Sequence, residues 1–161
     1  MTKPGYSRLQ ILLHWLIALL IIVAWQISDG MGRALRQHLE SGGSGFADAT
    51  LHVWIGVAVF ALVLLRIIVR WGQGAPAPVA GTPPLLALVA KLGHALLYLL
   101  MIVVPTSGIA AWFLRIGEAG EVHELAADGL MIVALLHALA AIWHQFGRRD
   151  GTLTRMVRAR G

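Results

Sequence analysis

Histidine is the residue type in this chain best suited to chemistry inside an apolar segment. Seven histidines occur in 161 residues, and His123, His137 and His144 lie in one run, residues 122 to 146, that is apolar enough to cross a membrane. An ionisable side chain inside a bilayer is costly, so it usually marks a functional site or a buried polar contact. At 100° and 1.5 Å per residue, His123 and His137 share nearly one helical face about 21 Å apart. They therefore belong to two different layers.

Composition indicates the elements that must position these side chains. With 58% hydrophobic residues, 13% charged residues and a mean hydropathy of +0.74, the chain does not resemble a soluble domain. A membrane-spanning helix needs about 20 mostly apolar residues. The first apolar run lacks a cleavage signal, and we expect it to be retained. The sequence predicts an all-α integral membrane four-helix bundle in a single domain, residues 1–161, with helices at about 9–28, 49–69, 85–114 and 122–146.

Basic residues are distributed unevenly between the two sides of the predicted bundle. The external side has three, Arg33, Arg36 and Arg115, and the other side has ten: Lys3, Arg8, Arg66, Arg70, Lys91, Arg148, Arg149, Arg155, Arg158 and Arg160. Positive residues prefer the cytoplasmic side, so both termini are expected in the cytoplasm. The sequence pI of about 10.8 then reflects topology and attraction to anionic inner-leaflet lipid. No nucleic-acid motif accompanies this charge, and no nucleic-acid partner is expected.

Two further histidines lie at depths that match His123 and His137. His14 is in the inner half of the first predicted helix, and His52 is in the outer half of the second. The expected pairs are His14 with His137 and His52 with His123. Two facing imidazoles in each of two layers suit the axial ligation of two b haems. Zinc would need a tighter cluster, and the absence of cysteine excludes thiolate-ligated iron–sulfur clusters and c-type haem.

Alternatives remain open at this point. Small residues near the pairs leave space for a porphyrin but also permit ordinary helix packing. A single intramembrane histidine could bond a backbone carbonyl or line a proton or metal pathway without haem. His94 lies in the inner half of the third helix, and spacing alone permits it as another partner for His137. His38 is expected in a surface loop without a catalytic role.

Other candidate site residues lie near the two membrane surfaces. His144 is about 10 Å closer to the cytoplasm than His137, where it could meet a quinone carbonyl, bond a haem propionate or be structural. Arg70 and Lys91 are weaker quinone-side candidates, because topology already explains positive residues there. On the external side, Arg33, Arg36 and Arg115 could attract a small anionic donor.

Four segments in order resemble the successive motif blocks of the bacterial cytochrome b561 family: "YSRLQILLHWL", "LHVWIGVAVFALVLLRIIVR", "LGHALLYLLMIVVPTSG" and "VHELAADGLMIVALLHALAAIWHQFGRRDGTLTRM". The resemblance covers nearly the whole chain. It implies a di-haem b protein of the bacterial inner membrane whose axial ligands are His14, His52, His123 and His137. It leaves His94 as a non-ligand and favours His144 for a quinone site.

The family includes proteins that pass electrons to ubiquinone, among them a superoxide oxidase, and haem subunits that anchor hydrogenases or dehydrogenases. The resemblance therefore implies a lipid-embedded enzyme that moves electrons from an external donor, with superoxide favoured, to ubiquinone. A haem b subunit serving a partner dehydrogenase is the first alternative. A histidine-lined proton or metal pathway without haem is the second.

Overall fold

The computed structural model describes residues 5–42, 45–79 and 81–159, and every regular element in these ranges is helical. Four helices are long and apolar enough to cross a membrane, in agreement with the sequence. The elements are α1 Arg8–Gln26, α2 Met31–Ser41, α3 Leu51–Gln73, α4 Pro84–Phe113, α5 Glu118–Phe146 and a short 3-10 helix, η1, Leu153–Met156.

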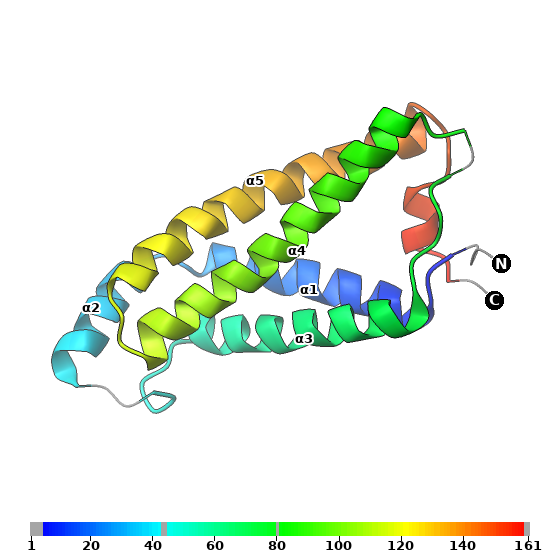
Figure 1. Cartoon of the computed structure of the whole chain (residues 1–161). Coiled ribbons are helices and arrows are strands. Elements are labelled where there is room, and N and C mark those ends of the chain that lie inside the picture. The colour runs from blue at the N-terminus through cyan, green and yellow to red at the C-terminus, as the bar shows by residue number, and fades with distance from the viewer. Residues whose placement is uncertain (1–4, 43–44, 80, 160–161) are drawn as a thin grey trace.

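The long helices pack in the order α1 on α3, α3 on α4 and α4 on α5 (Figure 1). The N-terminal start of α1, the connection from α3 to α4 and η1 lie at one end of the bundle, which we name the terminal end. The short helix α2 lies at the other end, which we name the α2 end (Figure 1). The described parts of both chain ends thus lie on one side of the bundle.

Polar side chains fasten α1 to α3 at the terminal end. Ser7 and Gln10 form a capping box, in which each side chain accepts a hydrogen bond from the other residue's backbone N–H. The Gln10 amide also donates to the Gly74 carbonyl at 2.8 Å, and the Ser7 hydroxyl donates to Gln73 at 2.6 Å. Arg66 donates to the Gln10 carbonyl at 2.9 Å. These bonds fix the depth of α1 against α3.

The apolar core is small and lies midway along the bundle. Ile17 of α1 packs with Val59 and Val63 of α3, and Met101 and Ile102 of α4 cover them. Most other large apolar side chains of the four long helices face outward. In a spanning bundle that surface contacts lipid tails, so this outward apolar surface is expected rather than a defect.

Two helix ends differ from the sequence prediction. Helix α3 continues to Gln73, where Gly74 ends it with a φ of 74°. Helix α5 begins at Glu118, before the strongly apolar run. Apolar periodicity marks only the part of a helix that lies in hydrocarbon, so polar turns at the helix ends escape it.

The external connection, whose Gly- and Ser-rich sequence predicts a short amphipathic turn around Arg33 to Leu39, contains the eleven-residue helix α2. Its apolar face packs on the turn between α4 and α5. A Cβ at Gly120 would lie 2.8 Å from Leu35 Cδ2, and one at Gly117 would lie 3.5 Å from Leu39 Cδ1. Arg115 donates a hydrogen bond to the Leu39 carbonyl. Small residues and one arginine therefore hold α2 across the end of the bundle.

His38 was expected in an exposed loop, and that expectation is wrong. It lies on α2, is 3% exposed and stacks on the Trp112 ring with a centroid separation of 4.1 Å. Its Nδ1 bonds the Asp48 carboxylate at 2.7 Å, and its Nε2 donates to the Trp112 carbonyl at 2.9 Å. The ring thus joins α2, the following loop and α4. Local sequence does not reveal these contacts, because they connect separate segments of the chain.

Replacing His38 by Ala should loosen α2. The substitution leaves a buried carbonyl at Trp112 without its donor, which costs about 1–3 kcal/mol. A loss of that size lowers Tm by about 5 °C in a chain of this length. Thermal melting of purified protein in detergent measures the change. Gln37→Ala, an exposed neighbour on the same helix, is the matched control, and equal melting of the two variants would contradict the role assigned to His38.

Candidate functional site

The first histidine pair lies at the α2 end. His52 is in the first turn of α3, directly after the Thr50 N-cap, and His123 is in the second turn of α5. Their ring centroids are 5.9 Å apart and their planes are at 79°. Both side chains are half-buried. The structure therefore brings together the two residues that sequence depth had paired, and we name them the outer pair.

Backbone carbonyls orient both rings of the outer pair. His52 Nδ1 donates to the Ala24 carbonyl at 2.9 Å, and His123 Nδ1 donates to the Val104 carbonyl at 2.7 Å. A carbonyl can only accept, so each Nδ1 carries the proton and each Nε2 keeps its lone pair. This is the tautomer and the orientation that metal-ligating histidines commonly show.

Gly108 on α4 permits the position of His123. A Cβ at this residue would lie 2.9 Å from His123 Nδ1 and 3.1 Å from Cε1. These separations are shorter than van der Waals contact, so a larger residue would push the ring away from α4. The His123 bond to Val104, which is one helical turn before Gly108, would then be lost.

The second pair lies toward the terminal end. His14 of α1 and His137 of α5 have ring centroids 6.4 Å apart, and we name them the inner pair. His94 of α4 comes even closer to His137, at 5.1 Å. The His94 ring is tied to its own helix, because Nδ1 donates to the Ala90 carbonyl at 2.6 Å. The structure therefore gathers three histidines in this layer.

Centroid separation distinguishes His14 from His94 as a partner of His137. A metal–imidazole bond of about 2 Å, with about 1 Å more from nitrogen to ring centre, puts two imidazoles on opposite sides of one ion about 6 Å apart. The separations of 5.9 and 6.4 Å agree with that value, whereas 5.1 Å is too short. A Cβ at Gly56 or Gly129 would meet no atom within 4 Å.

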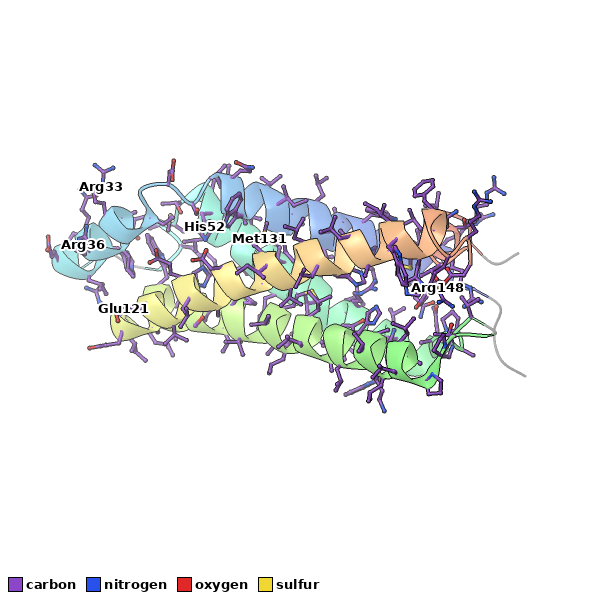
Figure 2. All side chains as sticks on the ribbon, turned by 90° about the horizontal axis from the view of Figure 1, so that it is seen from above. Arg33, Arg36, His52, Glu121, Met131 and Arg148 are labelled. Carbon is purple, nitrogen blue, oxygen red and sulfur yellow. The ribbon has the colours of Figure 1, made fainter. Side chains whose placement is uncertain are left out.

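A cavity of about 240 Å³ opens beside the outer pair. His52 lines it together with Asp29, Gly30 and Met31, where α1 leads into α2. The Arg33 guanidinium lies 3.9 Å from the position of a Cβ on Gly30, so it sits at the rim. Figure 2 shows Arg33 and Arg36 at the tip of the α2 end, beyond His52. Both arginines are exposed, whereas Arg115 is engaged with α2.

The candidates at the terminal end are separated from one another. His144, in the last turn of α5, bonds the Asp150 carboxylate through Nδ1 at 2.5 Å. The Arg70 guanidinium lies over the Tyr98 ring, 5.7 Å from its centroid. Lys91 is exposed on α4. No recorded contact joins Arg70 or Lys91 to His144 within the described ranges.

Comparison with known proteins identifies the family of this chain. The family model of prokaryotic cytochrome b561 matches residues 5–159. The chain belongs to the prokaryotic cytochrome b561 family. A cytochrome b562 of Cereibacter sphaeroides is 42% identical over 98% of both chains. A probable superoxide oxidase of Yersinia pestis is 31% identical over 94% of this chain and 95% of that protein, and cytochrome b561 homolog 2 of Escherichia coli is 25% identical over 97% and 93%.

Membership of the cytochrome b561 family makes this chain a multi-pass membrane haem protein that transfers electrons. The two histidine pairs fit the haem b that the family implies, because each offers two imidazoles at the separation of two axial ligands. Within the described residues, no group of three or more His, Cys, Asp or Glu side chains surrounds a common point.

Sequence reasoning missed the groups that position the histidines. The Ala24 and Val104 carbonyls carry no signal, since every residue has a carbonyl. Gly108 follows Pro105 in α4, and a glycine inside a spanning helix was the available clue. Asp150 stands before Gly151 in a turn sequence just beyond α5, a pattern that could have drawn attention to it.

Gly108→Ala should disturb the outer pair alone. The added methyl group displaces the His123 ring, so one low-spin haem signal should weaken or shift while the other is unchanged. Redox titration of the purified protein, followed in the visible α-band, separates the two. Gly93→Ala on the same helix is the control, because a Cβ there meets nothing within 4 Å. An unaltered spectrum in the Gly108 variant would contradict the close approach.

A second prediction separates His14 from His94. If the 6.4 Å pair holds the inner haem, His14→Ala should lower the haem content by one of two haems and His94→Ala should retain both. His52→Ala and His123→Ala should each remove the other haem. The haem-to-protein ratio and the α-band of each variant measure this. Two normal haems in His14→Ala, together with loss in His94→Ala, would reverse the assignment.

Proposed function

We propose that this protein binds two b haems, the outer one between His52 and His123 and the inner one between His14 and His137. The observation that carries this proposal is the pair of imidazole separations, 5.9 and 6.4 Å, in two layers. His123 and His137 stand about 21 Å apart along one helix face, so the layers serve opposite halves of a bilayer. The terminal end faces the cytoplasm by its excess of Lys and Arg.

The proposed activity is electron transfer through a bacterial inner membrane from an external donor to ubiquinone. Haem b, when bound, supplies a one-electron carrier. The chain's own residues orient the two outer rings, fix the distance between the layers and surround them with apolar helices. The Ala24 and Val104 carbonyls keep the outer rings from turning.

Ubiquinone is assigned to the terminal end, beside His144. This residue lies seven positions after His137, on nearly the same face of α5 and about 10 Å farther toward the cytoplasm. Its Nδ1 is occupied by Asp150, which leaves Nε2 for a quinone carbonyl. Arg70 and Lys91 are secondary candidates, and the Arg70 contact with Tyr98 already gives that residue a structural role.

Superoxide is the favoured donor, and the cavity beside His52 is its proposed access route. The cavity is large enough for a small anion, and Arg33 stands at its rim. Two facts favour this donor: the positive charge at that rim and the 31% identity to a probable superoxide oxidase. The external side also carries seven acidic residues against three arginines: Asp29, Glu40, Asp48, Glu118, Glu121, Glu124 and Asp128. Attraction of an anion must therefore come from arginines close to the cavity. At physiological salt, charges beyond about 8 Å are largely screened.

The alternative is a haem subunit that receives electrons from a partner dehydrogenase. Such a partner would use the same α2 end and the same outer pair. The donor experiment decides between the two versions, and family membership argues against a haem-free histidine pathway.

Superoxide should reduce the oxidised protein and form quinol. Superoxide is generated enzymatically with protein and a short-chain ubiquinone present, while the haem α-band and quinol are followed with and without superoxide dismutase. Both signals should appear only without the dismutase. Signals that are absent, or that the dismutase does not suppress, would reject superoxide and favour the dehydrogenase version.

Arg33→Gln and Arg36→Gln refine this test. Both arginines are exposed on α2, but Arg33 is the one at the cavity rim. Arg33→Gln should slow superoxide-dependent reduction by about threefold at low salt and less at high salt, as expected for one nearby charge. Arg36→Gln is the matched control and should have the smaller effect.

A further inference from the structure

We propose that Asp150 is a positioning residue that holds the His144 imidazolium as the proton donor to ubiquinone. The inference rests on the proposed function, because it assumes that quinone is reduced beside His144. It adds a component that neither the family nor the relatives' names assign, namely a carboxylate that sets the direction and the charge of the donating ring.

The chain that follows α5 folds back onto His144. Gly147 and Arg148 donate backbone hydrogen bonds to the Trp143 carbonyl at 2.8 and 3.1 Å and end the helix. Arg149 and Gly151 then adopt positive φ values of 54° and 73°, which turn the chain. The Asp150 backbone N–H donates to the His144 carbonyl at 3.2 Å while the Asp150 carboxylate receives His144 Nδ1–H. The turn is therefore attached to one residue by both backbone and side chain.

Both carboxylate oxygens of Asp150 have defined partners. Oδ1 accepts the Thr152 hydroxyl at 2.7 Å and the Thr152 backbone N–H at 3.1 Å. Oδ2 accepts His144 and pairs with Arg148 Nε at 3.5 Å. Burial raises the pKa of the Asp150 carboxyl, but the hydrogen bonds from His144 and Thr152 outweigh it and lower the pKa to about 2. The group is therefore a carboxylate throughout the physiological pH range.

The charges around the pair are few and specific. The Asp150 side chain is 11% exposed and that of His144 is 18% exposed. Arg148 also lies over the Trp143 ring, 5.8 Å from its centroid, which holds the guanidinium beside the turn (Figure 2 labels Arg148 at this end). Helix η1 packs on α5 and carries Arg155, but its guanidinium donates to the Ala77 carbonyl. Among the described residues, Arg148 is thus the charged side chain that contacts the His144–Asp150 pair.

The reaction at this end consumes electrons and protons together. Ubiquinone takes two electrons and two protons to become ubiquinol, and two superoxide ions supply the electrons as they become two O₂. The His144 Nε2–H bond breaks, and an O–H bond forms on one quinone carbonyl oxygen. The ring then regains its proton from cytoplasmic water, which also protonates the other oxygen. Asp150 loses no proton; it stabilises the charged ring before each transfer and keeps Nε2 directed outward.

The experiment compares variants of the full-length holoprotein, with quinone reduction measured from pH 5.5 to pH 9. His144→Asn removes the donor and should slow reduction by about a hundredfold, the usual lower value for a lost general acid. Asp150→Asn keeps the shape but removes the charge. It should slow reduction at neutral pH by about tenfold, and the alkaline fall in rate should begin at a lower pH. Asp150→Glu should recover most of the rate.

Thr152→Val is the matched control for the turn. It removes one bond to Oδ1 but keeps the carboxylate, so the position of the pH profile should not change. An unchanged haem α-band and unchanged superoxide-dependent haem reduction must accompany each variant, which shows that the bundle is folded. A slow His144→Asn variant with a wild-type profile in Asp150→Asn would overturn the role of Asp150 and leave the quinone site in place. A wild-type rate of quinone reduction in His144→Asn would overturn both the role of Asp150 and the quinone site beside His144. If Thr152→Val and Asp150→Asn slowed quinone reduction equally and neither shifted the pH profile, the turn would have only a structural role, and the role of Asp150 would be overturned.

Discussion

The bundle must keep ionisable rings in a low-dielectric interior and still present one free nitrogen from each ring. An imidazole without a polar partner there would cost free energy, and one with both nitrogens bonded to protein would have no lone pair left for a ligand. The outer pair meets both demands with backbone carbonyls. Ala24 lies in the last turn of α1, where carbonyls lack helical partners, so the bond from His52 also satisfies an orphaned acceptor. The end of α1 and the start of α3 are therefore placed by the same interaction.

The rest of the α2 end follows from holding this pair. The Thr50 cap starts α3 just before His52, and Gly108 allows α4 to approach the His123 ring. One turn beyond Gly108, Trp112 supplies the surface on which His38 stacks. Helix α2 is thereby fastened above the outer pair, with its basic face outward and the cavity at its first turn. Met31 and Ala34 of α2 line this cavity together with His52.

Much of this architecture was readable in the sequence, and the missing parts have physical reasons. Apolar length predicted the four long helices, and helical rise predicted which histidines share a depth. Helix α2 was underestimated because its eleven residues gain their stability from packing on Gly117 and Gly120, which are distant in sequence. His38 was misplaced because its partners, Asp48 and Trp112, belong to other segments. Spacing along the chain did not separate His14 from His94 as a partner of His137, and their ring separations of 6.4 and 5.1 Å give a criterion that only the folded chain contains.

The two ends of the bundle differ in the acceptor that each gives to histidine. The outer rings donate to neutral carbonyls, which place a proton on each Nδ1 and fix the direction of each ring. His144 donates to a carboxylate, which makes a charge-assisted hydrogen bond. On the proposed function, the outer pair takes part in one-electron transfer alone, whereas reduction of a quinone beside His144 requires protons as well as electrons. The acceptor therefore changes from carbonyl to carboxylate at the end of the bundle where the proposed function needs a proton, and Asp150 directs the His144 ring that would supply it.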